Sequence, residues 1–233
     1  YGDEWRKAGV REERIKVRGG ATLIDKVIYT HHGPVVRRTG EPAFANMDVP
    51  TDAALRWLAH DPSNEFLTLY ALNRAGSYAD YVKALETWDC PAQNIVYADR
   101  EGTIAIWHNG KYPLRWKGQG RYVLDGSDPA DDWQGWVPRG HVPHVRDPER
   151  GFVGSANQLA ANAEYPYYLG WDYAPYERAA RINEILGTAR DITPEGMVRM
   201  QTDVVDIRAR AVVPVLAGLL REKPMTEAEK KCF

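Results

Sequence analysis

The hydrophobic and polar positions of the chain alternate in short runs near its start and again near its middle. Residues 14–17 alternate, residues 23–29 form a second apolar run, and glycines separate the two, which predicts two strands joined by a turn. Residues 93–98 and 103–107 predict the clearest hairpin, with its turn at residues 99–102. Because both of these strands are nearly continuously apolar, we expect both faces of the hairpin to be covered.

Apolar residues at helical spacing occur in two parts of the chain. They predict five helices, over residues 65–75, 78–87, 175–186, 194–202 and 204–220. Ser77 and Thr193 stand where N-caps are expected, and Pro214 should kink or split the last helix. Residues 43–57 predict short strands and turns, and the polar tail at residues 226–231 is helix-prone.

A short stretch after the middle of the chain combines a predicted strand with an exposed amide. Phe152 and Val153 predict a buried strand, which we expect to join the hairpin in one antiparallel sheet with the 175–186 helix packed on it. The small residues 154–156 let another backbone or a ligand approach closely. Asn157 then offers an N–H₂ donor of the kind that stabilises an oxyanion during acyl transfer. A plain strand or turn cap explains the same asparagine, so spacing alone leaves its role open.

Composition and charge narrow the classes of function. The chain has 233 residues, 44% of them hydrophobic, which is enough for one large domain or two small ones. A net charge of −2 argues against a nucleic-acid-binding protein or a polybasic membrane protein. No apolar run reaches the length of a membrane span, and the polar first five residues do not form a signal peptide. Eight Trp and thirteen Tyr indicate either a pocket for apolar groups or a core filled with aromatic side chains.

Three patterns contain metal-ligating residue types without the spacing of a known site. His31 and His32 are adjacent, and neighbouring side chains of a strand point to opposite faces, so the pair does not favour one metal ion. Residues 125–132 contain four aspartates in eight positions, which could attract a calcium ion, but the spacing lacks the glycine and the terminal glutamate of an EF-hand calcium loop, so a solvated turn is the simpler interpretation. His141 and His144 are three residues apart, and the proline between them indicates a loop. We therefore predict no metal site, and Cys90 and Cys232 form no metal motif.

Four longer stretches resemble one enzyme family. They are residues 94–104 (NIVYADREGTI), 132–138 (DWQGWVP), 155–158 (SANQ) and 176–182 (YERAARI). Their order and separations are similar to those in the large chain of penicillin acylases and acyl-homoserine-lactone acylases, which are N-terminal-nucleophile amidohydrolases. Weaker similarity extends back through residues 29–36 almost to Tyr1, so the resemblance covers nearly the whole chain.

The resemblance implies an α+β fold of the N-terminal-nucleophile hydrolase type, a partial αββα sandwich with an antiparallel sheet and packed helices. Residues 1–233 then correspond to an internal fragment of the catalytic domain of the large chain. Within it we expect residues 1–60 to be mainly β, 61–90 a helical pair, 91–158 sheet and loops, and 159–233 mainly helical.

The resemblance also assigns site residues. In the family, a serine at the N-terminus of the large chain is the nucleophile, and its own amine is the base. Residue 1 here is Tyr, so the nucleophile is not in this chain and the fragment alone is predicted to be inactive. Asn157 matches the side-chain donor of the family's oxyanion hole, and Arg178 matches an arginine that positions it. Some relatives bind a structural calcium ion, but the matching ligand position is about Leu169, so no cofactor or metal is expected in this chain.

The implied partners are the remainder of the large chain, the small α chain and a small-molecule N-acyl substrate, with no nucleic acid and no membrane. The implied location is periplasmic or secreted. The function implied is cleavage of a linear, non-peptide carbon–nitrogen amide bond. An alternative of a different class is an autonomous aromatic-rich module that binds a ligand or carbohydrate without catalysis. A reading frame that continues upstream into a processing site would favour the hydrolase.

Overall fold

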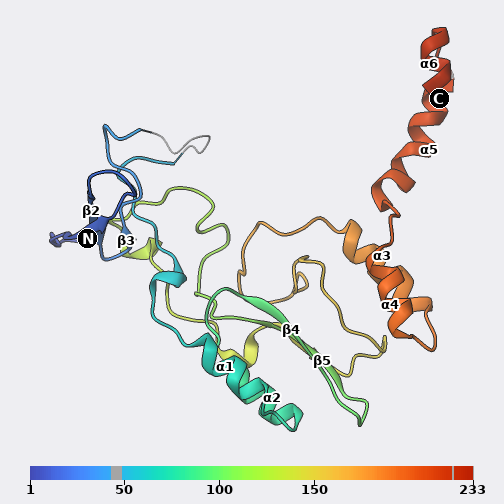
Figure 1. Cartoon of the computed structure of the whole chain (residues 1–233), viewed down its shortest axis with the longest axis horizontal. Helices are drawn as coiled ribbons and strands as arrows, with labels where there is room; N and C mark the ends of the chain where they lie inside the picture. The colour runs from blue at the N-terminus through green and yellow to red at the C-terminus, as the bar shows by residue number, and fades with distance from the viewer. Residues whose placement is uncertain (43–48, 222, 233) are drawn as a thin grey trace.

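The protein is described by a computed structural model that covers residues 1–42, 49–221 and 223–232. The architecture is α+β, as predicted, with two three-stranded antiparallel sheets and helices between and after them (Figure 1). The strands are β1 (Gly9–Ile15), β2 (Leu23–Thr30), β3 (Gly33–Pro34), β4 (Gln93–Ala98), β5 (Ile104–Asn109) and β6 (His144–Arg146). The helices are α1 (Glu65–Leu72), α2 (Tyr78–Leu85), α3 (Glu177–Thr188), α4 (Pro194–Gln201), α5 (Ile207–Arg221) and α6 (Glu227–Cys232). Single 3₁₀ turns lie at η1 (Leu58–His60), η2 (Pro129–Asp131) and η3 (Arg139–His141).

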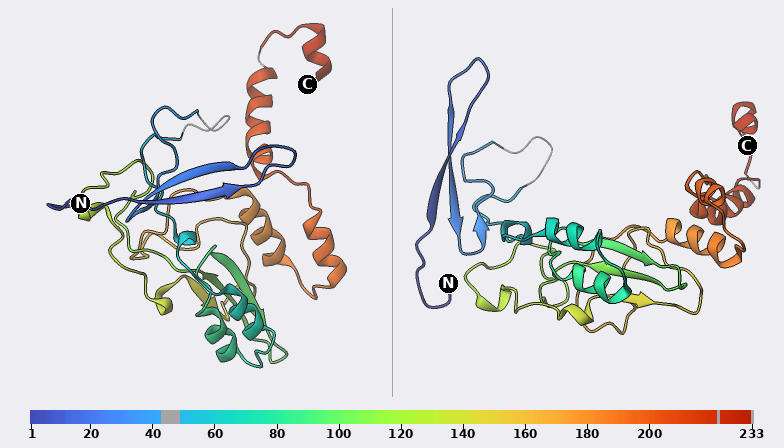
Figure 2. Two further views of the ribbon diagram at one scale, coloured as in Figure 1. Left: turned by 60° about the vertical axis from the view of Figure 1, so that its left-hand side comes forward. Right: turned by 60° about the horizontal axis from the view of Figure 1, so that its bottom comes forward.

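The first sheet contains a hairpin near the N-terminus, as predicted, but its first strand, β1, spans residues 9–15 and not 14–17. β1 pairs with β2 along its whole length, ending with Ile15 opposite Leu23, and the hairpin projects from the body of the molecule (Figure 2). His31 and His32 form the turn between β2 and β3. The alternation of a strand therefore does not apply to them, and the expectation that they point to opposite faces is wrong. Their ring centroids lie 3.7 Å apart.

The second sheet contains the hairpin predicted most clearly, and α2 packs on one of its faces. Ile95 of β4 stands opposite Trp107 of β5. The Tyr81 hydroxyl of α2 donates to the Ile95 carbonyl at 2.7 Å, and the Trp107 indole N–H donates to the Tyr78 hydroxyl at 3.1 Å. On the opposite face, Val96 is 61% exposed. The expectation that both faces of the hairpin are covered is therefore wrong for this chain.

The hydrophobic core lies between α2, the second sheet and the loops that follow it. Its buried members come from widely separated segments: Tyr81, Leu85, Trp107, Tyr112, Val137, Val142 and Leu169. Aromatic side chains therefore fill much of this core. This agrees with the second explanation for the Tyr and Trp content, a core filled with aromatic side chains.

The helix starts follow from local capping. The Ser77 hydroxyl accepts a hydrogen bond from the Asp80 amide at 3.2 Å, and the Thr193 hydroxyl accepts one from the Gly196 amide at 3.2 Å. Both predicted N-caps are confirmed. Pro214 lies inside α5, which remains one helix and is not split. None of the helices in the described parts of the chain combines the length and the apolar composition needed to cross a bilayer.

Two expectations about the second sheet are wrong. Phe152 and Val153 have no strand hydrogen bonding, and β6 instead pairs with β5 as the third strand. The principal neighbour of α3 is α5, and α2 rather than α3 packs on the sheet. The short strands expected over residues 43–57 fall partly on residues 43–48, which lie outside the described residues.

Candidate active site

Asn157 is held in a backbone conformation that few residue types adopt. Its φ angle is +65°, in the left-handed region, which asparagine tolerates better than most non-glycine residues. Its amide N–H donates to the Ser155 hydroxyl at 3.2 Å, and its carbonyl accepts from the Ala174 amide at 2.9 Å. Ala156, directly before it, is buried. The backbone is thus fixed on both sides of an exposed side chain.

Arg178 orients the Asn157 side chain. It lies in the first turn of α3, and its Nη2 donates to the Asn157 Oδ1 at 3.1 Å. Because the amide oxygen is held in this way, the N–H₂ group points away from the guanidinium. That group has no hydrogen-bond partner among the residues that the structure describes. The two residues assigned from the family resemblance therefore lie in direct contact, 21 positions apart in sequence.

A chain of hydrogen bonds connects this segment to the second sheet. His108 Nδ1 donates to the Asn94 Oδ1 at 2.5 Å, and the Asn94 Nδ2 donates to the Ser155 hydroxyl at 2.9 Å. Asn94 and His108 are paired residues of β4 and β5. Burial lowers the pKa of His108, so the folded state favours its neutral ring. These hydrogen bonds therefore connect the second sheet to Asn157 through Asn94 and Ser155.

Ion pairs hold α3, and with it Arg178, against the residues that follow. Arg181 forms two hydrogen bonds with Asp203, of 2.8 and 2.7 Å, and Glu184 pairs with Arg210 at 2.9 Å. The Arg181 hydrogen bonds lower the pKa of Asp203. Each pair is partly exposed and contributes little on its own, but together they fix the position of the helix.

Leu169, the position that the family resemblance relates to a calcium ligand, belongs to the buried core. Its carbonyl accepts a hydrogen bond from Arg115 Nη2 at 3.0 Å. Burial lowers the pKa of Arg115, whose guanidinium also stacks on Tyr168. A side-chain cation therefore lies beside Leu169, where a second cation would be repelled.

Asn94, Ser155 and His108 also belong to the site, although the sequence does not predict this role for them. Asn94 and Ser155 stand inside two of the stretches that carry the family resemblance, and His108 closely follows the first of them. Nothing in the spacing shows that they touch, because 61 residues separate Asn94 from Ser155.

The fold of the chain is also found in a solved structure. Its structure superposes on a thermostable penicillin G acylase from Alcaligenes faecalis with a TM-score of 0.72 and 21% identity, over 99% of this chain and 41% of that one. The match shows that the two share a fold, the α+β fold of that hydrolase.

The penicillin amidase family model matches residues 1–232, so the chain belongs to the penicillin amidase family. It is 31% identical over 186 residues to penicillin acylase 2 proenzyme of Pseudomonas sp. (strain SE83), covering 80% of this chain and 23% of the relative. It is 27% identical over 205 residues to acyl-homoserine lactone acylase QuiP of Pseudomonas aeruginosa, covering 86% and 24%. The chain thus spans about a quarter of the length of these curated relatives.

Proposed function

We propose that this chain is part of an amidohydrolase of the penicillin acylase type that cleaves a linear, non-peptide amide bond of an N-acyl substrate. The observation that carries the proposal is the Asn157–Arg178 contact, which turns the amide N–H₂ outward from a fixed backbone, without a hydrogen-bond partner in the described part of the chain. The relatives named above are a penicillin acylase and an acyl-homoserine lactone acylase, and both names denote cleavage of an acyl group from nitrogen.

In the proposed mechanism, an N-terminal serine supplied from outside residues 1–233 attacks the amide carbonyl, and its own α-amine takes the proton. Negative charge then develops on the carbonyl oxygen. The Asn157 N–H₂ donates to this oxyanion, and Arg178 keeps the amide from rotating by holding its oxygen. Without the serine, residues 1–233 supply oxyanion stabilisation and positioning but no nucleophile.

The same proposal includes the remainder of the large chain and a small chain as partners. Apolar side chains exposed on β4 and along α5 support it, because a folded protein covers such surfaces. They are Val96, Val212, Val213, Val215, Leu216, Leu219 and Leu220. The name of the SE83 relative denotes a proenzyme, which agrees with a processed, two-chain product. We further propose a periplasmic or secreted location, on the family resemblance alone.

The test is steady-state kinetics on the full-length, processed enzyme, with a phenylacetyl amide and an N-acyl-homoserine lactone as substrates. Asn157→Ala should lower kcat by roughly 10²–10³, the usual loss for one such donor. KM should change little, because the hydrogen bond strengthens only as charge develops.

Asn183→Ala is the matched control. Asn183 is also exposed and also accepts from an arginine, Arg150, at 3.3 Å, but it lies on α3. The kcat of the Asn183→Ala enzyme should stay near that of the unaltered enzyme. A near-normal kcat for Asn157→Ala, with processing verified by mass spectrometry, would show that Asn157 is only a structural cap.

A further inference from the structure

His31, His32 and Asp132 form a cluster outside the Asn157 site. Each offers one ligand atom, and these atoms all lie within 4.8 Å of one another. It is the one group of three metal-ligating side chains found in the described ranges of the chain. The cluster joins the β2–β3 turn to the end of η2, at the opposite end of the molecule from α3 (Figure 1).

The distance between two of the ligand atoms fits a tetrahedral metal ion. His32 Nδ1 lies 3.1 Å from Asp132 Oδ1. Two ligands bound about 2.0–2.1 Å from a tetrahedral zinc ion are about 3.3 Å apart. The pair therefore needs almost no movement to bind. His31 is exposed, and its ligand nitrogen already lies within 4.8 Å of the other two ligand atoms.

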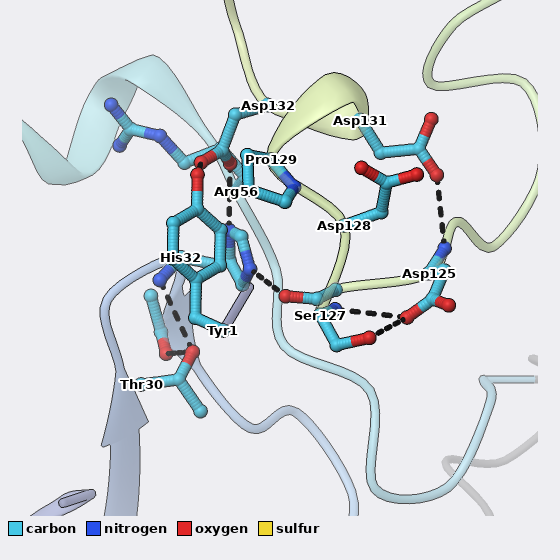
Figure 3. A network of polar contacts seen from close by, with 12 residues as sticks. Tyr1, Thr30, His32, Arg56, Asp125, Ser127, Asp128, Pro129, Asp131 and Asp132 are labelled. Atoms are coloured by element: carbon cyan, nitrogen blue, oxygen red, sulfur yellow. Dashed lines mark hydrogen bonds and ion pairs between the residues drawn. The ribbon is translucent and has the colours of Figure 1, made fainter. Parts of the chain in front are cut away.

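The hydrogen bonds around the cluster leave the right atoms available. His32 Nε2 donates to the Gly126 carbonyl, 2.8 Å away, so Nδ1, which pairs with Asp132 Oδ1, is the nitrogen that a metal ion would bind in place of a proton (Figure 3). A histidine ligand is usually oriented in this way by a carbonyl on its other nitrogen.

Asp132 is equally well fixed. The Tyr1 hydroxyl donates to its second carboxylate oxygen, Oδ2 (Figure 3). Its backbone carbonyl accepts from the Gln119 amide at 3.2 Å and from the Gln134 amide at 3.0 Å, and Gln119 is buried. The carboxylate therefore presents Oδ1 to His32 from a rigid backbone.

From this geometry we propose a structural site for a divalent transition-metal ion, with zinc as the best match, bound by His31, His32 Nδ1 and Asp132 Oδ1. Two imidazole nitrogens with one carboxylate select zinc or a similar ion over calcium and magnesium, which prefer oxygen ligands. A water molecule would complete four-coordination. The ion would hold the N-terminal sheet against the loop at residues 125–132.

The test uses tag-free, EDTA-treated protein that carries this chain in its full-length form. Titration with zinc chloride in a calorimeter should show one ion bound per chain at this cluster, and cobalt should give the visible absorption band of a tetrahedral site. Calcium chloride should give no heat attributable to the cluster. His31→Gln and Asp132→Asn should each weaken zinc binding by about 10-fold or more, as loss of a ligand or its support does.

His141→Gln is the matched control, because His141 is also an exposed histidine with a hydrogen-bonded ring, whose Nδ1 lies 2.7 Å from the Tyr167 hydroxyl. The zinc affinity of the His141→Gln protein should equal that of the unaltered protein. Circular dichroism establishes whether each variant is folded. If Asp132→Asn does not fold, the zinc affinity of His31→Gln, at an exposed position, tests the proposal. Absence of zinc binding, or binding that survives both cluster substitutions, would overturn the proposal.

Discussion

Substituting Asn157 with alanine and, separately, with glycine distinguishes the role of its amide from the role of its backbone. At φ +65°, an alanine meets the steric clash of the left-handed region, about 1–2 kcal/mol, whereas glycine meets none. Glycine also has the more flexible unfolded chain, which offsets part of the difference. We therefore expect Asn157→Gly to be more stable than Asn157→Ala by about 1 kcal/mol, or a Tm about 2–4 °C higher for a chain of this size.

Catalysis should respond differently from stability. Both variants remove the N–H₂ donor, which is worth about 2.7–4 kcal/mol of transition-state stabilisation. A backbone difference of about 1 kcal/mol changes a rate roughly fivefold at most. Loss of the amide donor is therefore the larger of the two effects, and kcat should fall by a similar factor of roughly 10²–10³ in both variants.

The assays are thermal unfolding followed by circular dichroism, and steady-state hydrolysis by the processed enzyme. Equal Tm values for the two variants would show that the left-handed backbone is not maintained in solution. A glycine variant that retains most of the unaltered kcat would show that the alanine variant fails through its backbone, and the oxyanion assignment would be wrong.

Two further predictions concern stability. Tyr81→Phe removes the 2.7 Å hydrogen bond to the Ile95 carbonyl in a buried setting, and it should cost about 1–2 kcal/mol in urea unfolding, whereas the exposed Tyr70→Phe should cost almost nothing. Hydrogen bonds from the Cys90 amide, and then from Ser63, lower the pKa of Glu65 to about 2. Because the folded pKa is below the ordinary value of about 4.3, this stabilisation is present above that pH and is lost as the pH falls toward 2. The Tm difference between the unaltered protein and Glu65→Gln should therefore shrink from about pH 6 to about pH 3; a constant difference would contradict this reasoning.

The elements that the sequence predicts correctly have strong local signals. The 93–107 hairpin has two apolar runs around a turn, and the starts of α2 and α4 have Ser77 and Thr193 as caps. These features depend on residues a few positions apart, so the pattern of a single segment is sufficient to specify them.

The failures have non-local causes. Two apolar residues, Phe152 and Val153, cannot specify which strand becomes the neighbour of β5, and β6 takes that position. The pattern also places His31 and His32 on a strand, whereas the chain reverses there in a two-residue turn between β2 and β3. In the candidate site, the family resemblance indicated the Asn157–Arg178 pair, while the hydrogen bonds that join Asn94 to Ser155 follow only from the folded chain.

The hydrogen bond from Arg178 to Asn157 Oδ1 indicates how a complex of the enzyme with its uncleaved substrate can be trapped. An aspartate at position 157 has nearly the shape of asparagine, tolerates the left-handed backbone and keeps an oxygen for the guanidinium. It replaces the outward N–H₂ with a second oxygen, which repels the developing oxyanion. Asn157→Asp is thus the substitution that keeps the site assembled while blocking turnover. An enzyme altered in this way should hold its uncleaved substrate long enough for crystallography to identify the acyl group.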